Sequence, residues 1–167
     1  MRLSLRAVLI CLVALVGLGA LISAPAAQEK TKVDYKAGWC EDDGVSLVIE
    51  GETTVTRCAK NFKDTSWKLF AATGNKVRGT SVYPVGFVCQ VNGYPKQQDC
   101  IDTPRYDEGS WAFFIAGPGS TKWQYALTGA STHFSECGSA EAWLWVPGTE
   151  SPETSMPSVK PVTRKCQ

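Results

Sequence analysis

The chain reads GVSLVIEGETTVTRC from residue 44 to residue 58, and this run decides the fold class. Apolar residues occupy every second position of its first half, a period of two that predicts a β-strand over 45–50. A short break follows at Gly51. The Thr- and Val-rich run over 53–58 then predicts a second strand that pairs back on the first. The sequence therefore predicts an antiparallel hairpin at the start of the domain.

One helix and further strands are expected after this hairpin. Asp64 or Thr65 is the predicted cap of a helix over 66–72, which ends at Gly74-Asn75. Strand signals dominate from there, with turns predicted at Asn92-Gly93 and at 117–120. The predicted strands are 80–83, 87–92, 111–116, 123–128 and 141–146. This order predicts an α+β domain in which one short helix packs on a mostly antiparallel sheet.

Both ends of the chain differ from the middle. Residues 1–26 combine a basic start, an apolar core and a small-residue cleavage site, which predicts a secretory signal peptide cut after Ala26 or Ala27. A retained membrane anchor and a lipoprotein signal at Cys11 are weaker interpretations of the same segment. We expect a flexible lead-in over 27–38, a disulfide-stapled β-rich domain over 39–147, and a disordered tail rich in Pro, Ser and Thr over 148–167.

The charge balance excludes partners that are recognised mainly by charge. Removing the signal peptide removes Arg2 and Arg6, which leaves 15 basic against 16 acidic residues and moves the net charge from +1 to −1. A balance this even gives no electrostatic basis for binding nucleic acid or an anionic membrane. The expected location is extracellular, either in the medium or at the cell surface through a partner, with no membrane span after cleavage.

Six cysteines remain after the signal peptide, an even number that predicts disulfides in an exported chain. Cys40 and Cys58 flank the predicted hairpin, and Cys89 and Cys100 bracket a turn-rich loop. The last two, Cys137 and Cys166, either pair with each other or leave Cys166 to link a dimer. No close cysteine pair accompanies the single histidine, so we expect no metal site.

The stretch from 40 to 146 resembles a family of secreted actinobacterial proteins of unknown function, which in turn look like the C-terminal, β-grasp-like domain of transcobalamin and intrinsic factor. The family usually has a Tyr-Trp-rich run where this chain has 110–114. The resemblance implies a β-grasp-like fold and a corrinoid or another vitamin-like ligand. The matching residues are 44–49, 57–59, 87–95, Cys100, 103–104, 109–111, 123–126, 128–130, 138–139 and 141–143.

No group of residues predicts catalysis. A Ser/His/Asp triad would have to use His133, which has no nucleophile-elbow motif around it and is read as a surface loop histidine. All six cysteines are assigned to disulfides, and the paired carboxylates are typical of exposed turns. We therefore expect a protein without enzyme activity and without a cofactor.

Six tryptophans carry the binding hypothesis. Trp111, Phe113, Trp123 and Tyr125 are expected to share one face of a hairpin, where they form either part of the core or a flat ligand platform. Trp143 and Trp145 are expected to face outward or to lie under a loop. Two functions follow: a module that binds a small ligand such as a corrinoid, or a cell-surface module that binds protein or glycan.

Overall fold

The computed structural model describes residues 35–166, so the predicted signal peptide and most of the predicted lead-in lie outside the described residues. Most of the described secondary structure is strand. The elements are β1 (Tyr35–Ala37), β2 (Gly44–Glu50), β3 (Thr54–Lys60), α1 (Ser66–Ala72), β4 (Val77–Arg78), β5 (Gln90–Val91), a 3-10 turn (Tyr106–Glu108), β6 (Ser110–Ala116), β7 (Gln124–Tyr125) and β8 (Ala140–Val146).

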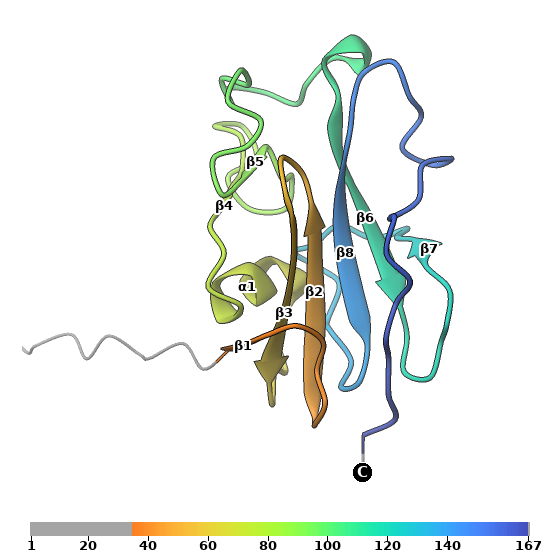
Figure 1. The fold of residues 1–167 in the computed structure, drawn as a ribbon. Helices are drawn as coiled ribbons and strands as arrows, with labels where there is room; N and C mark the ends of the chain where they lie inside the picture. The colour runs from red at the N-terminus through yellow and green to blue at the C-terminus, as the bar shows by residue number, and fades with distance from the viewer. Residues whose placement is uncertain (1–34, 167) are drawn as a thin grey trace, which may run out of the picture. The chain divides into compact units, whose positions relative to one another are not determined.

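Six of the strands form one sheet in the order β1-β3-β2-β8-β6-β7, and β4 pairs with β5 separately (Figure 1). The predicted hairpin is confirmed, because β2 and β3 pair antiparallel with Ile49 opposite Val55. The centre of the sheet is its one parallel contact, in which β2 lies beside β8. All seven residues of β2 are buried, as expected for a strand that is covered on both faces.

The first face of the sheet packs against α1. Leu69 and Phe70 of the helix are fully buried against a core that includes Leu47, Phe113 and Trp143. The helix has the predicted bounds and ends at Gly74, whose φ of +68° is the left-handed conformation that favours glycine. The described residues therefore form an α+β domain with one α-helix and a sheet that is mostly antiparallel.

The second face of the sheet is rich in alanine, which leaves room for another segment to lie close to it. Ala112, Ala116, Ala140 and Ala142 are buried there together with Phe114. The residues that cover this face come from the end of the chain, which we call the C-terminal strap (147–166). Figure 1 shows the strap running alongside β8 and β6.

The strap differs from the disordered tail that its composition predicts. Pro157 and Pro161 are buried, and Val159 packs against the second-face core. The indole Nε1 of Trp123 donates a hydrogen bond of 2.7 Å to the carbonyl oxygen of Val159. The Arg164 guanidinium Nε donates one of 3.0 Å to the carbonyl oxygen of Cys40. The strap is ordered because the sheet offers it apolar surface and hydrogen-bonding partners that are distant in sequence.

Three disulfides staple the domain. The bonds join Cys40 to Cys58, Cys89 to Cys100, and Cys137 to Cys166. The first two are the pairs that the local sequence predicts. The third ties the strap to the turn before β8, so Cys166 bonds within the chain here and is not the link of a dimer.

The lead-in and three predicted strands also differ from expectation. The predicted 87–92 strand is limited to the two residues of β5. Residues 35–37 form the edge strand β1, which pairs with β3, and the Arg57 guanidinium lies 4.7 Å from the centre of the Tyr35 ring. The segment 80–83 is not a strand, because the short pairing takes place earlier, at β4. Regular pairing of the predicted 123–128 strand is limited to the two residues of β7.

Candidate functional site

An aromatic cluster lies on the first face, where β6 and β8 pair. Phe113 is directly opposite Trp143, and their rings stack with centroids 4.5 Å apart and planes 7° from parallel. Trp111 is opposite Trp145 and meets it edge to face at 5.8 Å. The register of the two strands thus builds a two-layer aromatic ladder, the arrangement in which cross-strand pairs stabilise a sheet.

Part of this cluster forms the floor of a groove of about 410 Å³. We call it the aromatic groove. One wall comes from the loop that contains Gly86 and the other from the chain that follows β7. No residue with an ionised side chain lines it. The lining residues are 86–88, Trp111, Phe113, 125–130 and Trp143.

The rim of the groove exposes apolar side chains while its floor is closed. Leu127 is 96% exposed and Tyr125 is 37% exposed, whereas Trp111, Phe113 and Trp143 are all below 10%. A closed aromatic floor beside an exposed leucine is a preformed apolar surface, which is a common feature of small-ligand sites.

The four predicted binding residues do not share one platform. Trp111 and Phe113 lie in the floor of the groove, and Tyr125 borders it. Trp123 lies in the second-face core beneath the strap, 7% exposed. The reason is the register, because Tyr125 pairs with Phe114 and its ring packs on that side chain, which points to the face opposite Phe113.

Trp143 and Trp145 also lie elsewhere than the sequence predicts. Both belong to the first-face core, and Trp143 is tilted against Phe70 of α1 at 5.4 Å. Ala142 and Val146, on the other side of β8, belong to the second-face core, against which Val159 of the strap packs. Because both faces of the sheet are covered, the side chains on both sides of β8 are buried. The alternation of residues along one strand does not distinguish this arrangement from a sheet with one covered face.

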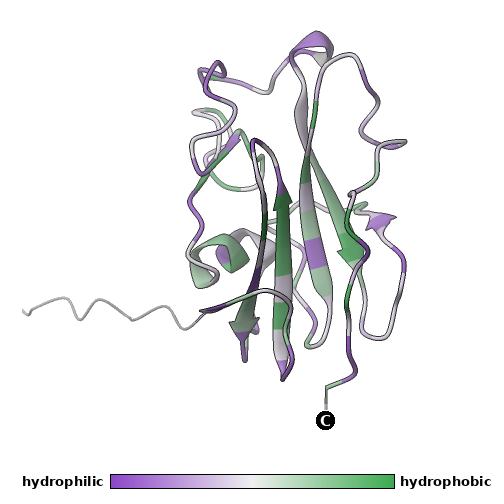
Figure 2. Cartoon of the chain, in the orientation of Figure 1, coloured by the Kyte–Doolittle hydropathy of each residue, from purple (hydrophilic) through white to green (hydrophobic). Residues whose placement is uncertain are grey.

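A second chemical feature, which the sequence analysis did not identify, is the carboxylate of Glu141. It is the one charged residue of β8, and Figure 2 shows a hydrophilic band across that strand. The side chain is fully buried, and neither of its oxygens has a hydrogen-bond partner. Burial raises the pKa of Glu141 to about 7, against the opposing effect of the Ser135 and Ser66 hydroxyls.

His133 is the neighbour of this carboxylate. Its Nε2 is 3.7 Å from Glu141 Oε1, and its ring meets Phe113 edge to face at 5.7 Å. Burial lowers the pKa of His133, and the nearby Glu136 opposes that shift. Glu141 shares the parity of Trp143 and points into the first-face core, but the sequence gives no signal for this, because it predicts that the Trp143 face of the strand is not part of the core.

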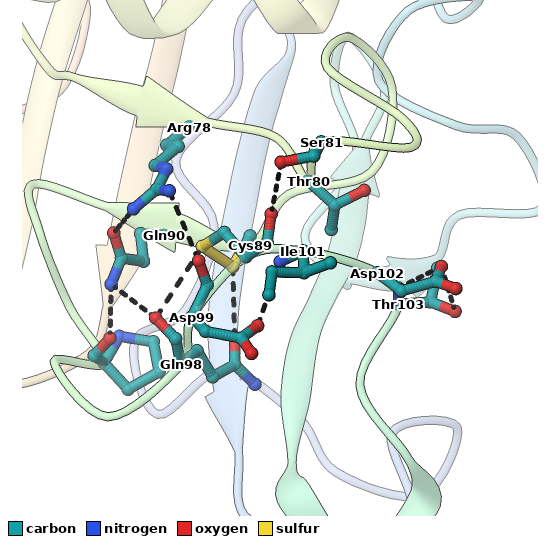
Figure 3. Close-up of a disulfide and its surroundings, with 12 residues drawn as sticks. Arg78, Thr80, Ser81, Cys89, Gln90, Gln98, Asp99, Ile101, Asp102 and Thr103 are labelled. Atoms are coloured by element: carbon teal, nitrogen blue, oxygen red, sulfur yellow. Dashed lines mark hydrogen bonds between the residues drawn. A yellow bond between two sulfur atoms is a disulfide. The ribbon is translucent and has the colours of Figure 1, made fainter.

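A further cavity of about 510 Å³ lies beside the Cys89–Cys100 disulfide. Figure 3 shows how its loop is held: Arg78 donates to the Gln90 side chain and to the carbonyl oxygen of Asp99. The Asp99 carboxylate accepts from the Ile101 amide at 2.9 Å. Because this hydrogen bonding occupies the Asp99 carboxylate within its own loop, we do not take the cavity as the candidate site.

The described residues contain one group with metal-ligand chemistry, Asp43 with Cys137 and Cys166. Both cysteines are bonded to each other in a disulfide. Because the thiolate is the form of cysteine that binds metals, this group is not a metal site as it stands.

Comparisons with known proteins give no family for this chain. No protein-family model, no curated protein and no solved structure matches it. Within residues 35–166, no helix has the length and apolar character needed to cross a membrane. The functional argument therefore depends on the site itself.

Proposed function

We propose that this protein is a secreted, non-catalytic binding module that takes a small, largely apolar ligand in the aromatic groove. The observation that carries the proposal is Leu127, 96% exposed at the rim of a groove with an aromatic floor. Burying a leucine side chain contributes about 1.5–3 kcal/mol of free energy, so a ligand that covers Leu127 gains this much towards binding.

The lining of the groove defines the chemistry of the ligand. Ring surfaces form the floor, and the absence of ionised side chains in the lining favours a neutral ligand or the neutral part of a larger one. The volume falls in the lower half of the range of roughly 300–1,000 Å³ that is usual for small-molecule sites. A small ligand can bind entirely within the groove, whereas a larger flat ligand can insert only one edge into it.

A corrinoid is the first ligand to test, because the chain resembles the secreted relatives of the transcobalamin C-terminal domain. A β-grasp-like fold and a vitamin-like ligand are parts of the same proposal. The one-helix α+β arrangement of the described residues is consistent with it, and Phe113 and Trp143 give the groove an aromatic floor.

Calorimetric and tryptophan-fluorescence titrations of the purified protein test this function, first with cobalamin and then with other vitamins. We expect saturable binding that Leu127→Ser weakens roughly 10-fold, the effect of losing one buried leucine. Val82→Ser is the matched control, because Val82 is 53% exposed and does not line the groove. Binding that Leu127→Ser leaves unchanged, or no binding of any of these ligands, would overturn the proposal.

A second candidate function is docking to a protein or glycan at the cell surface. Val82, Tyr83 and Val85, which precede the Gly86 wall of the groove, are each more than half exposed. A macromolecular partner would cover this loop as well as the groove. Tyr83→Ser should then weaken retention on cell-wall material, whereas a ligand confined to the groove should bind the variant normally.

A further inference from the structure

Glu141 is placed where an ionised carboxylate is least favourable. It lies on the central strand β8, between Leu47 of β2 and Ile115 of β6. Neither oxygen has a hydrogen-bond partner in range, and the opposing effect of the nearby Ser135 and Ser66 hydroxyls is smaller than that of the lost water. A buried carboxylate in this situation is stable only when it holds a proton.

The groups that face Glu141 come from α1 and from the segment before β8. Ser66 of α1 and Ser135 contribute hydroxyls, and His133 is the one titratable side chain of the described residues within 4.0 Å of the carboxylate. The neighbouring residues on β2 and β6 are apolar. Among charged groups nearby, Glu136 acts on His133, and Asp64 pairs with Lys68 at the surface.

The directions of the two pKa shifts place one proton in this pair. Burial raises the pKa of Glu141 to about 7 and lowers that of His133, so the neutral acid beside the neutral imidazole is the favoured form between these two pKa values. As the pH rises further, the proton leaves. An uncompensated carboxylate then remains in the core unless water can reach it.

The segment that shields Glu141 from water, residues 129–139, is held to the start of α1 by a small set of hydrogen bonds. The amides of Ser66 and Trp67 donate to the carbonyl oxygens of His133 and Ala130, at 3.0 and 2.9 Å. The amide of Ser135 donates to the carbonyl oxygen of Asp64 at 3.0 Å. Opening this contact exposes Glu141 without separating the strands of the sheet.

We propose that Glu141, packed beside His133, forms a pH-sensitive latch, in which loss of the Glu141 proton releases the 129–139 segment from the start of α1. Closing the latch requires a neutral Glu141, and opening it lets water reach the carboxylate. Gly129 and Ala130 also line the aromatic groove, so opening changes the shape of one wall. That consequence for ligand binding rests on the proposed function, whereas the latch itself does not.

Amide hydrogen exchange of the ligand-free protein tests the latch. We expect protection at the amides of Ser66, Trp67 and Ser135 to fall by about 30-fold between pH 5.5 and pH 8.5, after correction for intrinsic exchange. This factor is the linkage expected when the pKa of a carboxyl group is about 7 in the closed form and 4.5 in the open one. Most of the change should occur by pH 7.5. Amides at the centre of β2 are the internal reference: they exchange through global unfolding and respond to urea, whereas the three latch amides should exchange through a local opening that low urea concentrations do not affect.

Two variants separate the latch from a general effect of pH. Glu141→Gln keeps the shape of the side chain without the titration, so its protection should not fall as the pH rises; the lowered pKa of His133 acts in the opposite direction. Glu136→Gln removes an exposed carboxylate from the same segment and should behave like the wild type. A response to urea at these amides equal to that at β2, protection that does not fall with pH in the wild type, or protection that falls equally in Glu141→Gln would overturn the proposal. Because the wild-type comparison between segments is decisive alone, the test holds even if Glu141→Gln does not fold. Failure of ligand binding would leave every one of these outcomes unchanged.

Discussion

Glu50 at the end of β2 and Val159 in the strap are 109 residues apart in sequence and are joined by a hydrogen bond, because the Val159 amide donates to Glu50 Oε1 at 3.2 Å. The other carboxylate oxygen accepts from the Ser158 amide at 2.9 Å. Glu50 is 8% exposed, so its charge is compensated mainly by these two donors. A single buried carboxylate thus holds the middle of the strap against the central strand of the sheet.

Replacement of Glu50 by glutamine should therefore loosen the strap. The amide side chain can accept from one of the two backbone donors but presents its own N–H groups to the other. We expect a loss of about 1.5–3 kcal/mol in the free energy of unfolding, measured by urea denaturation. Glu52→Gln is the control, because Glu52 is exposed and its contact with Lys96 is 3.9 Å long. An equal, small effect of both substitutions would show that the strap does not depend on Glu50.

The strap also shows which parts of this fold can be predicted from the sequence and which cannot. Local signals are sufficient for the hairpin, the helix and two of the disulfides, because each depends on neighbours in the chain. The strap is ordered because it packs against a surface of alanines from β6 and β8. Its own Pro-, Ser- and Thr-rich composition does not indicate that such a surface exists. Val48 of β2 and Phe114 of β6, large apolar residues that alternate with the first-face residues, are local indications that the second face is covered.

The same reasoning applies to the candidate site. Trp111 and Phe113 could be chosen from the sequence because aromatic residues alternate along one strand. Trp123 lies on the other face because of the register in which the short strand β7 pairs with β6. That register cannot be predicted from the sequence, so Trp123 could not be distinguished from Trp111 and Phe113. Glu141 was overlooked because a glutamate in a strand is usually exposed, and only the packing of α1 and 129–139 over it shows otherwise.

Gly138 should be difficult to replace, because the strap passes directly over it. Its φ is +80°, and a Cβ at this position would overlap the carbonyl oxygen of Arg164. We expect Gly138→Ala to cost several kcal/mol of stability, since strain at the backbone adds to displacement of the strap. Gly93→Ala is a matched control, because Gly93 has φ +82° and open space around its Cβ position. It should cost about 1 kcal/mol, as for strain alone. Equal losses in thermal denaturation would argue against a close-packed strap.

Removal of the third disulfide should weaken the fold without changing the state of association. The Cys137–Cys166 bond closes a loop with a sequence separation of 29, for which the entropy of the unfolded chain predicts a loss of about 3 kcal/mol in the Cys137→Ser/Cys166→Ser variant. Urea denaturation measures this loss. A non-reducing gel of the wild type should show a monomer, and a dimer that disappears on reduction would contradict the pairing within the chain.

The stability of the whole protein should fall as the pH rises from 4.5 towards 7, because of Glu141. Its pKa is raised from 4.5 to about 7 by burial, so in this range the folded protein keeps a proton that the unfolded chain has lost. The stabilisation is therefore complete below pH 4.5 and is lost as the pH passes through the folded-state value. The total change is about 3 kcal/mol.

The lowered pKa of His133 works in the opposite direction. The unfolded chain takes up a proton at this histidine below about pH 6.5 more readily than the folded protein does, so this contribution alone makes stability increase with pH up to that value. The difference between wild type and Glu141→Gln cancels the histidine contribution to first order. Measured by urea denaturation at several pH values, that difference should shift in favour of the variant from pH 4.5 to 7 and then level off. A difference that stays constant over this range would mean that Glu141 is ionised in the folded protein at acidic pH, and that a donor compensates its charge.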